Sequence, residues 1–210
     1  ADLREGIDDL PDARFYGFSA TTPEIAFAKK LAKMVDGKTI IGGAHATVLP
    51  QDCMDYFDYL VIGEGEYAIL KILQGRASYD VVVGERIIDL DKIPFPDWDA
   101  IDNPFSESLF PGEKYGKGDK AATLIASRGC PFNCGFCANI YNKPVVFRSA
   151  DNIILEMKEL IKRDIRYFRF EDDNITIHPE FSILMERIKD LDVHWKCHAR
   201  SDLLTLKKAQ

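Results

Sequence analysis

The most informative part of this chain reads Ser127-Arg128-Gly129-Cys130-Pro131-Phe132-Asn133-Cys134-Gly135-Phe136-Cys137. Its three cysteines stand at the spacing C-x3-C-x2-C, and the apolar run at 121–126 that precedes them predicts a buried strand. A loop rich in Gly and Pro at the end of a strand can fold its thiolates around one inorganic centre. Three thiolates suit a 4Fe–4S cluster with one open iron, because four cysteines are needed to close such a cluster. A small molecule could chelate that iron.

A structural zinc site is the main competing interpretation of these cysteines. Such a site usually closes with four Cys or His ligands, often as paired C-x2-C units, and the chain has no second pair. The histidines His178, His194 and His198 lack the spacing of a zinc finger. The remaining cysteines, Cys53 and Cys197, are remote in sequence, and we expect them to be buried as small apolar residues. The pattern therefore favours the open cluster.

The cysteine loop resembles the signature of the radical SAM superfamily, C-x3-C-x-aromatic-C, with Phe136 at the aromatic position. The resemblance implies that Cys130, Cys134 and Cys137 ligate a 4Fe–4S cluster. It also implies that the unique iron binds the amino and carboxylate groups of S-adenosylmethionine, with Phe136 beside the adenine. Reductive cleavage would then give a 5′-deoxyadenosyl radical. The cofactors carry this chemistry, while the protein orients them and excludes solvent.

The composition is that of an ordinary globular protein. The 210 residues are 46% hydrophobic and 29% charged, which fits one or two domains. The net charge of −7 gives no polyanion-binding surface, so we expect no nucleic-acid partner. Five cysteines, three of them clustered, fit a reducing cytoplasm better than a disulfide scaffold. Without a membrane-length apolar run or a signal peptide at its start, the sequence predicts a cytoplasmic protein with no membrane partner.

The first third of the chain alternates between strand and helix patterns. Three strands are expected, at 14–20, 38–41 and 59–62. A helix is expected after each strand. The first has Thr22 as its N-cap and Gly37 as its C-terminal stop, the second is short and lies around 51–56, and the third spans 67–73 and ends at Gly75. Such alternation indicates a parallel sheet with ligand-binding loops at the carboxyl ends of its strands.

Two of these strand ends are rich in glycine, at Gly42-Gly43-Ala44-His45 and Gly63-Glu64-Gly65. Glycines let a backbone approach a flat ligand closely, but they also make ordinary turns, and neither loop matches G-x-G-x-x-G. Beside the cysteine motif, they resemble the last strand ends of the cobalamin-binding domain that precedes many radical SAM barrels. The resemblance implies cobalamin contacts at Gly42, Gly43, Gly63 and Gly65, with His45 either structural or at the ligand's edge. The histidine motif D-x-H-x-x-G is absent, so either it lies upstream or cobalt takes no histidine.

Residues 76–119 are expected to form a connector. The run at 80–88 predicts a small hairpin that turns at Gly84. The segment at 93–98 contains two prolines, which bias the preceding residues to extended geometry, so it predicts a linker rather than a helix. The Gly/Lys-rich run at 111–120 is expected to be mobile.

The pattern after the cysteine loop is that of a βα repeat. Ser149 is expected to cap a helix, 166–170 to form a strand, Pro179 to open the next helix, and 193–200 to form another strand before a last helix near Leu204. Such repeats build barrels of the TIM type, whose active-site groups lie at the carboxyl ends of the strands.

The acidic residues Glu171, Asp172 and Asp173 stand at such a strand end. An acidic turn there is commonly just solvated. In the radical SAM family this position holds the motif that receives the amino group of S-adenosylmethionine, often Gly-Gly-Glu, from which this chain departs. The resemblance implies that Asp172 or Asp173 contacts the ammonium, as a charged hydrogen bond would favour. Arg200, after the next strand, would pair with the cofactor carboxylate, with a substrate anion, or in a surface salt bridge.

Together these features predict an α/β chain with three parts. Residues 1–75 form a partial Rossmann-like parallel sheet of the cobalamin-binding type, 76–119 a hairpin and Pro-rich linker, and 120–210 the first half of a radical SAM βα partial TIM barrel. A full eight-unit barrel takes about 250 residues, so we expect a fragment of a longer enzyme that lacks both ends.

The expected function is that of a radical SAM enzyme, with cobalamin for methyl transfer or radical rearrangement. Its substrate would be a small molecule or a peptide, and a flavodoxin or ferredoxin would supply electrons. Self-association through the open barrel edge is also expected. Two alternatives remain open: an iron–sulfur electron-transfer protein, and a non-catalytic or split subunit that needs a partner to complete its barrel.

Overall fold

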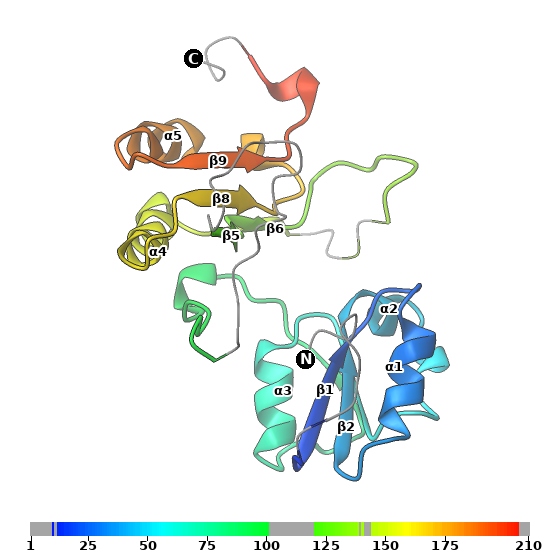
Figure 1. The fold of residues 1–210 in the computed structure, drawn as a ribbon. Helices are drawn as coiled ribbons and strands as arrows, with labels where there is room; N and C mark the ends of the chain where they lie inside the picture. The colour runs from blue at the N-terminus through cyan, green and yellow to red at the C-terminus, as the bar shows by residue number, and fades with distance from the viewer. Residues whose placement is uncertain (1–9, 11, 101–119, 139, 141–143, 206–210) are drawn as a thin grey trace. The chain divides into compact units, whose positions relative to one another are not determined.

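The computed structural model describes residues 10, 12–100, 120–138, 140 and 144–205. The chain forms two compact units, Ala1–Ile87 and Ile88–Gln210. Each unit is built on a parallel sheet with helices between its strands, so the predicted α/β class is confirmed (Figure 1).

The first unit is a four-stranded sheet in the order β1-β2-β3-β4, and all neighbouring strands are parallel. The strands are β1 Phe15–Ser19, β2 Lys38–Gly42, β3 Tyr59–Ile62 and β4 Val81–Val83. The α-helices are α1 Ile25–Ala32, α2 Gly43–Val48 and α3 Glu66–Leu73. Figure 1 shows α1 and α2 on one face of the sheet and α3 on the other, which gives the sheet two separate apolar layers. The three predicted strands are confirmed.

The predicted hairpin at 80–88 is wrong. Val81–Val83 instead pairs parallel with β3, so that Leu60 faces Val81 in the register, and the first unit has a fourth strand. Gly84 is needed for close backbone approach rather than for a turn, because a Cβ there would lie 1.7 Å from the carbonyl oxygen of Glu64. The Gly84 N–H also donates to the Ile62 carbonyl, which extends the parallel pairing.

Two helix predictions in this unit are also wrong in detail. The helix after β2 lies at Gly43–Val48, and the residues around 51–56 form only the 3₁₀ turn Pro50–Asp52 and further turns. The N-cap of α1 is Glu24 rather than Thr22. The Thr22 hydroxyl is hydrogen-bonded to the ring of His45 instead, which accounts for the difference.

The second unit contains a three-stranded parallel sheet in the order β5-β8-β9. Its strands are β5 Ala121–Leu124, β8 Tyr167–Phe170 and β9 His194–Cys197, and a separate antiparallel pair joins β6 Ser127–Arg128 to β7 Val146–Phe147. The helices are α4 Ala150–Lys162 and α5 Phe181–Lys189, with 3₁₀ turns at Leu90–Lys92, Ile175–Ile177 and Ser201–Leu203.

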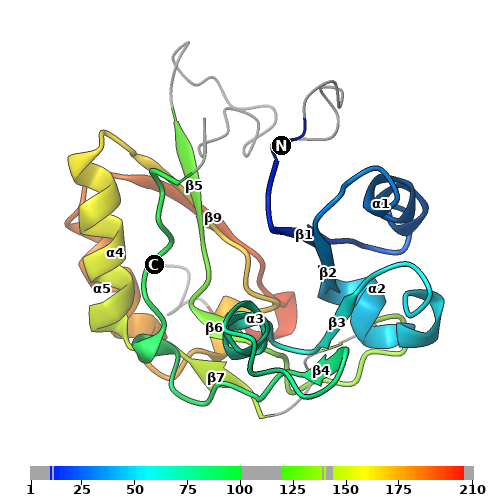
Figure 2. The same ribbon diagram turned by 90° about the horizontal axis from the view of Figure 1, so that it is seen from below.

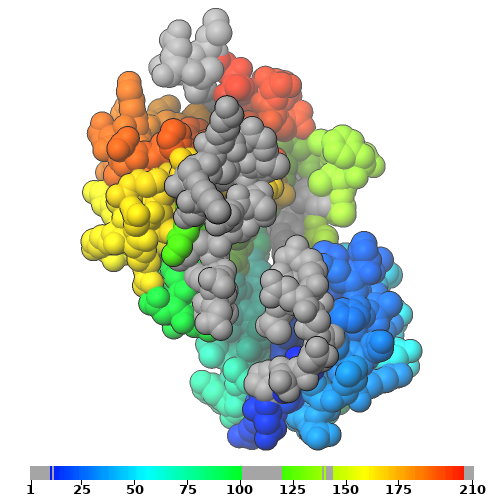
Figure 3. Space-filling model, in the orientation of Figure 1, coloured from blue at the N-terminus to red at the C-terminus, as the bar shows by residue number. Residues whose placement is uncertain are grey.

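The two α-helices of this unit cover one face of its sheet (Figure 2). They adjoin each other in the space-filling view, where α4 is yellow and α5 orange (Figure 3). Their buried residues meet Phe168 and Phe170 of β8 in one apolar core. The predicted cap of α4 is confirmed, because the Ser149 hydroxyl accepts a hydrogen bond from the Asn152 N–H.

The remaining structural predictions concern the linker and the chain's last residues. The segment at 93–98 is irregular, as its prolines predict. The run at 111–119 lies outside the described residues. The last helix predicted near Leu204 is a 3₁₀ turn at Ser201–Leu203 as far as the described residues extend. Within the described parts of the chain, none of the helices has the length and apolarity that crossing a bilayer requires.

Candidate functional site

The cysteine loop begins after β6, at the carboxyl end of β5. Cys130 and Cys134 are partly exposed and Cys137 is exposed, and the Cys137 N–H donates to the Cys134 carbonyl over 3.0 Å. Phe136 is 94% exposed, so its ring is available to a ligand rather than committed to the core. This is the edge of a parallel βα sheet at which ligand-binding loops gather.

The three thiols are the donors that an iron–sulfur cluster requires, but they do not form a preorganised metal site. Among residues 10, 12–100, 120–138, 140 and 144–205, no group of three or more Cys, His, Asp or Glu side chains is arranged to hold a metal ion. Sulfur is nevertheless the donor that iron–sulfur clusters take, and one loop carries all three cysteines. The donor chemistry therefore fits such a cluster, and ligation by these three residues stays a prediction.

Arg200 lies against this loop. Its Nη1 donates to the Cys134 Sγ over 3.3 Å, and its Cζ lies 4.2 Å from the centroid of the Phe132 ring. The same guanidinium forms an ion pair with Asp202 at 2.7 Å. The sequence left three roles open for Arg200, and of these the structure contains the salt bridge. A cation beside a cysteine sulfur also stabilises the thiolate that metal ligation requires.

The two cysteines outside the loop have a different environment. Cys53 is fully buried in the first unit, and Cys197 is partly buried at the end of β9. Desolvation raises the pKa of both thiols, and the negative charges of Asp52 and Asp172 respectively raise them further. Because the thiolate is the metal ligand, a raised thiol pKa disfavours ligation at both positions.

The neighbouring acids after β8 have opposite environments. Asp172 is 2% exposed, and its carboxylate accepts hydrogen bonds from the Ala126 N–H and the Ser127 hydroxyl. Asp173 is exposed to solvent. Glu171 is also exposed and forms an ion pair with Arg169 at 2.6 Å. Only Asp173 of the two candidate aspartates therefore presents its carboxylate where a cofactor ammonium could approach.

Burial dominates the electrostatics of Asp172. Desolvation raises the pKa of its carboxyl group, and the hydrogen bonds from Ser127 and Ala126 oppose this only in part. A carboxylate in that position is therefore costly for the folded chain, and each of its oxygens accepts at least one protein hydrogen bond.

The glycine-rich ends of β2 and β3 lie at the same edge of the first sheet, and one side chain links them. The Thr47 hydroxyl donates to the Gly43 carbonyl over 2.8 Å and accepts from the Gly63 N–H over 3.1 Å. Gly43 and Gly63 have φ values of +86° and +84°, which residues with a side chain rarely adopt. Gly42 and Gly65 are the N-caps of α2 and α3. The edge therefore presents bare backbone, which suits a flat ligand.

His45 is a structural residue in this edge. It is buried, with Nδ1 3.1 Å from the Thr22 hydroxyl and Nε2 2.9 Å from the Asp52 carboxylate. Asp52 also pairs with Lys29 at 2.7 Å. Hydrogen bonds from Lys29 and then His45 keep the pKa of Asp52 below its usual value. Both ring nitrogens of His45 thus have protein partners, which agrees with the structural role that the sequence left open.

Two residues that bear on the cysteine loop were missed in the sequence. Arg148 donates to the Ile125 carbonyl just before the loop, and it forms a buried ion pair with Glu156 at 2.6 Å. No spacing marks this pair as unusual, because Arg148 stands beside a capping serine and Glu156 in an ordinary amphipathic helix. The burial of Asp172 continues the alternation of buried and exposed side chains along β8.

Comparison with known proteins identifies both units. The model of the radical SAM superfamily matches residues 124–210, which include the cysteine loop and the second sheet. Over this segment the chain is similar to the radical SAM superfamily. The model of the B12 binding domain matches residues 1–73, which include both glycine-rich strand ends. A radical SAM domain thus follows a B12-binding domain in one chain, as the sequence predicts.

Two curated relatives match nearly all of this chain. The bacteriochlorophyllide d C-12(1)-methyltransferase of Chlorobaculum tepidum is 28% identical over 97% of the chain and 46% of its own length. The anaerobic magnesium-protoporphyrin IX monomethyl ester cyclase of Rubrivivax gelatinosus is 31% identical over 98% of the chain and 42% of its own length. The chain thus spans about half the length of these two relatives.

A solved structure has the same fold as this chain. The cobalamin-dependent S-adenosylmethionine radical enzyme OxsB aligns with a TM-score of 0.67 at 15% identity, over 94% of this chain and 32% of that one. At this identity the likeness establishes the fold, and the partial Rossmann-like and βα-barrel architecture is confirmed.

Proposed function

We propose that this chain supplies the cofactor-binding parts of a cobalamin-dependent radical SAM enzyme that catalyses methyl transfer or cyclisation. The observation that carries the proposal is the C-x3-C-x2-C loop at the carboxyl end of β5, in one chain with a B12-binding domain. The relatives of this chain include methyltransferases and cyclases, which supports these two reaction classes.

Cys130, Cys134 and Cys137 would hold a 4Fe–4S cluster and leave one iron for S-adenosylmethionine. When bound and reduced, this cluster supplies the electron that cleaves the sulfonium of S-adenosylmethionine to a 5′-deoxyadenosyl radical. Asp173, exposed after β8, would bind the cofactor ammonium by a charge-assisted hydrogen bond. Phe136 would cover the adenine with its exposed ring. Arg200 would keep negative charge on the Cys134 sulfur.

The carboxyl edge of the first sheet would hold cobalamin. Gly42, Gly43, Gly63 and Gly65 leave the backbone at this edge uncovered, and Thr47 keeps the two loops together. When bound, cobalamin supplies a carrier for a methyl group. His45 would support the loop from behind, since both of its ring nitrogens have protein partners.

The family chemistry requires a reductant, and we propose a flavodoxin or ferredoxin as the donor to this chain. A cytoplasmic location is proposed because three clustered thiols need a reducing compartment. The substrate is proposed to be a small molecule or a peptide. Self-association through the outer edge of β9 also stays a prediction, because β9 pairs only with β8 among the described residues.

The test is anaerobic reconstitution with iron and sulfide, followed by incubation with S-adenosylmethionine, hydroxocobalamin and a low-potential reductant. We expect close to four irons per chain by the cluster stoichiometry and formation of 5′-deoxyadenosine or S-adenosylhomocysteine. Cys134→Ala should remove the cluster. Cys53→Ala is the matched control, since it deletes the same thiol from a buried position in the other unit.

The outcomes separate this proposal from its main rival. A reconstituted cluster that accepts electrons but yields neither product would favour an iron–sulfur electron-transfer protein or a split subunit that needs a partner to complete its barrel. A chain that takes up no iron would refute the cluster itself.

A further inference from the structure

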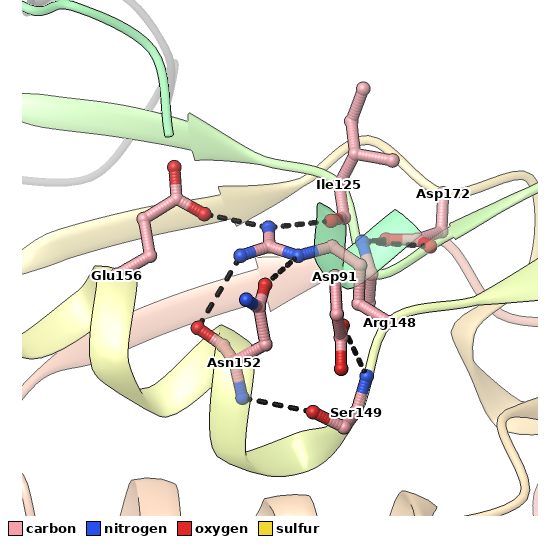
Figure 4. A network of polar contacts seen from close by, with 8 residues as sticks. Asp91, Ile125, Arg148, Ser149, Asn152, Glu156 and Asp172 are labelled. Carbon is pink, nitrogen blue, oxygen red and sulfur yellow. Dashed lines mark hydrogen bonds and ion pairs between the residues drawn. The ribbon is translucent and has the colours of Figure 1, made fainter. Parts of the chain in front are cut away.

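The residues that lead into the cysteine loop are held by two side chains from later in the sequence. Ile125, Ala126 and Ser127 connect β5 to the loop, and Ala126 and Ser127 are buried. Figure 4 shows Asp172 on one side of this connection and Arg148 on the other. Cys130, the first proposed cluster ligand, follows only three residues after Ser127.

Asp172 holds the connection from the end of β8. Both of its carboxylate oxygens lie 3.1 Å from the Ala126 nitrogen, and Oδ1 accepts the Ser127 hydroxyl over 2.5 Å. These are buried, charge-assisted hydrogen bonds, which are stronger and more directional than neutral ones. A cofactor ammonium could use this carboxylate only by competing for oxygens that already accept from the Ala126 N–H, which is itself buried.

Arg148 holds the same connection from the start of α4. Its backbone N–H donates to the Ala126 carbonyl over 2.8 Å, and its Nη1 donates to the Ile125 carbonyl over 3.0 Å. Glu156 and Asn152 fix the guanidinium in turn, at 2.6 Å and 2.7 Å (Figure 4). Arg148 and Asp172 thus bind four polar groups before the loop: the Ile125 carbonyl, the Ala126 N–H and carbonyl, and the Ser127 hydroxyl.

We propose that Asp172 is a positioning residue that fixes the start of the cysteine loop, and that it does not bind S-adenosylmethionine. This inference rests on the proposed function, because the loop is taken to carry the cluster ligands. A carboxylate this deeply buried is costly unless it is hydrogen-bonded, and its three hydrogen bonds all come from residues before Cys130. Asp173 is left as the acid for the cofactor ammonium.

The proposal predicts how the cluster responds when Asp172 is changed. Groups that orient metal ligands from behind typically contribute about 10- to 100-fold in metal affinity. Asp172→Ala removes every acceptor that faces Ala126 and Ser127, so iron loss to a chelator should be about tenfold faster or more. Asp172→Asn keeps one oxygen where Oδ1 accepts from both groups, so it should hold the cluster nearly as well as the wild type.

The experiment compares these variants with Asp173→Asn in the full chain after anaerobic reconstitution. Three quantities are measured: the rate of iron loss to a chelator, the electron paramagnetic resonance spectrum of the reduced cluster with and without S-adenosylmethionine, and the dissociation constant of that cofactor. Asp172→Asn should leave the dissociation constant unchanged. Asp173→Asn should raise it about tenfold or more and leave iron loss unchanged, because it deletes a charged hydrogen bond to the cofactor alone.

Each outcome decides the proposal. Wild-type iron retention in Asp172→Ala would overturn it, and so would an Asp172→Asn variant that keeps its cluster but binds S-adenosylmethionine tenfold more weakly. If Asp172→Ala does not fold, Ser127→Ala is used in its place. The Ser127→Ala variant should then lose iron faster than Asp172→Asn does. Equal or slower loss would overturn the proposal. A wild-type chain that binds no iron would refute the proposed function instead, and amide exchange at Ala126 would then test the Asp172 contact separately.

Discussion

Breaking the buried ion pair between Arg148 and Glu156 should destabilise the second unit by about 3 kcal/mol. The two side chains are 11% and 4% exposed, and their charged atoms lie 2.6 Å apart. Removing one partner of a buried pair typically costs about 3–5 kcal/mol, because the other charge is left buried without compensation. Arg148 keeps neutral acceptors on Ile125 and Asn152, so Glu156→Leu should fall at the lower end of that range.

The same helix offers a matched control. Glu159 pairs with Lys162 at 2.6 Å, but both side chains are about half exposed or more. Exposed pairs of this kind contribute about 0–1 kcal/mol, so Glu159→Gln should change the free energy of unfolding by less than about 0.5 kcal/mol. Glu156→Gln keeps an acceptor for Arg148 and loses only the charge, so it should cost about 1.5 kcal/mol.

Urea denaturation followed by tryptophan fluorescence measures these effects in the right unit. The chain has two tryptophans, Trp98 and Trp195, and both lie in the second unit. With a slope of about 2 kcal/mol per molar urea, a loss of about 3 kcal/mol lowers the midpoint by about 1.5 M. The measurement is made on reduced protein without iron, so that cluster loss does not enter the comparison.

A double variant completes the test. Replacing both partners, as in Arg148→Met with Glu156→Leu, leaves no unpaired charge, so it should cost less than the two single losses added together. The reasoning is refuted if Glu156→Leu unfolds at the same urea concentration as Glu159→Gln, because the buried charge of Arg148 would then be compensated in some other way.

Three further outcomes are expected. Cys134→Ala should abolish iron–sulfur absorption, whereas Cys53→Ala should retain it, and full iron retention in the first variant would remove that ligand. Asp58→Asn should destabilise the first unit by about 1 kcal/mol near pH 7. Desolvation raises the pKa of Asp58, but hydrogen bonds from Lys38 and Thr39 outweigh it and lower that pKa overall. The stabilisation is therefore present above about pH 4, and the stabilities of the wild type and Asp58→Asn should converge as the pH falls through the native pKa. A stability difference that does not change with pH would contradict this. Arg200→Met should lower the cluster's reduction potential, because it removes a hydrogen bond to the Cys134 sulfur, and an unchanged potential would show that the contact is absent once iron is bound.

Strands β2, β3 and β5 could be predicted from local sequence because each is a short, mostly apolar run with buried side chains. The fourth strand of the first unit could not be placed in the same way. Val81–Val83 is β-branched throughout, which predicts a strand but not its partner or direction. Its parallel pairing with β3 depends on the crossover through α3, a long-range feature. Gly84 was interpreted as a turn residue, whereas its bare backbone is required where Glu64 passes close by.

The helix α2 was missed for a related reason. Gly42 and Gly43 indicate a loop by local preference, since glycine is unfavourable in helix interiors. The helix forms nevertheless, because Gly43 stands at its first position and Ala46 and His45 are buried against the sheet. Tertiary packing thus outweighs local propensity over these six residues.

The candidate site shows the same division between local and long-range information. The cysteine spacing and the position of the loop after β5 are local, and both were predicted. The contact between Asp172 and Ser127 joins residues 45 positions apart, so no spacing motif could reveal it. The buried pair of Arg148 and Glu156 was missed because its burial depends on how α4 packs over the second sheet.

One signal in the sequence did distinguish the two aspartates. Side chains alternate between the faces of a strand, and in β8 the buried positions are Phe168 and Phe170. The alternation continues past the end of the strand, so that Asp172 is buried in phase with the phenylalanines and Asp173 is exposed. The alternating pattern from Phe168 to Asp173 therefore predicts that the first aspartate faces the protein and the second faces solvent. A family motif that only requires acid at this strand end treats the two as equivalent, whereas the period of the strand assigns each a different partner.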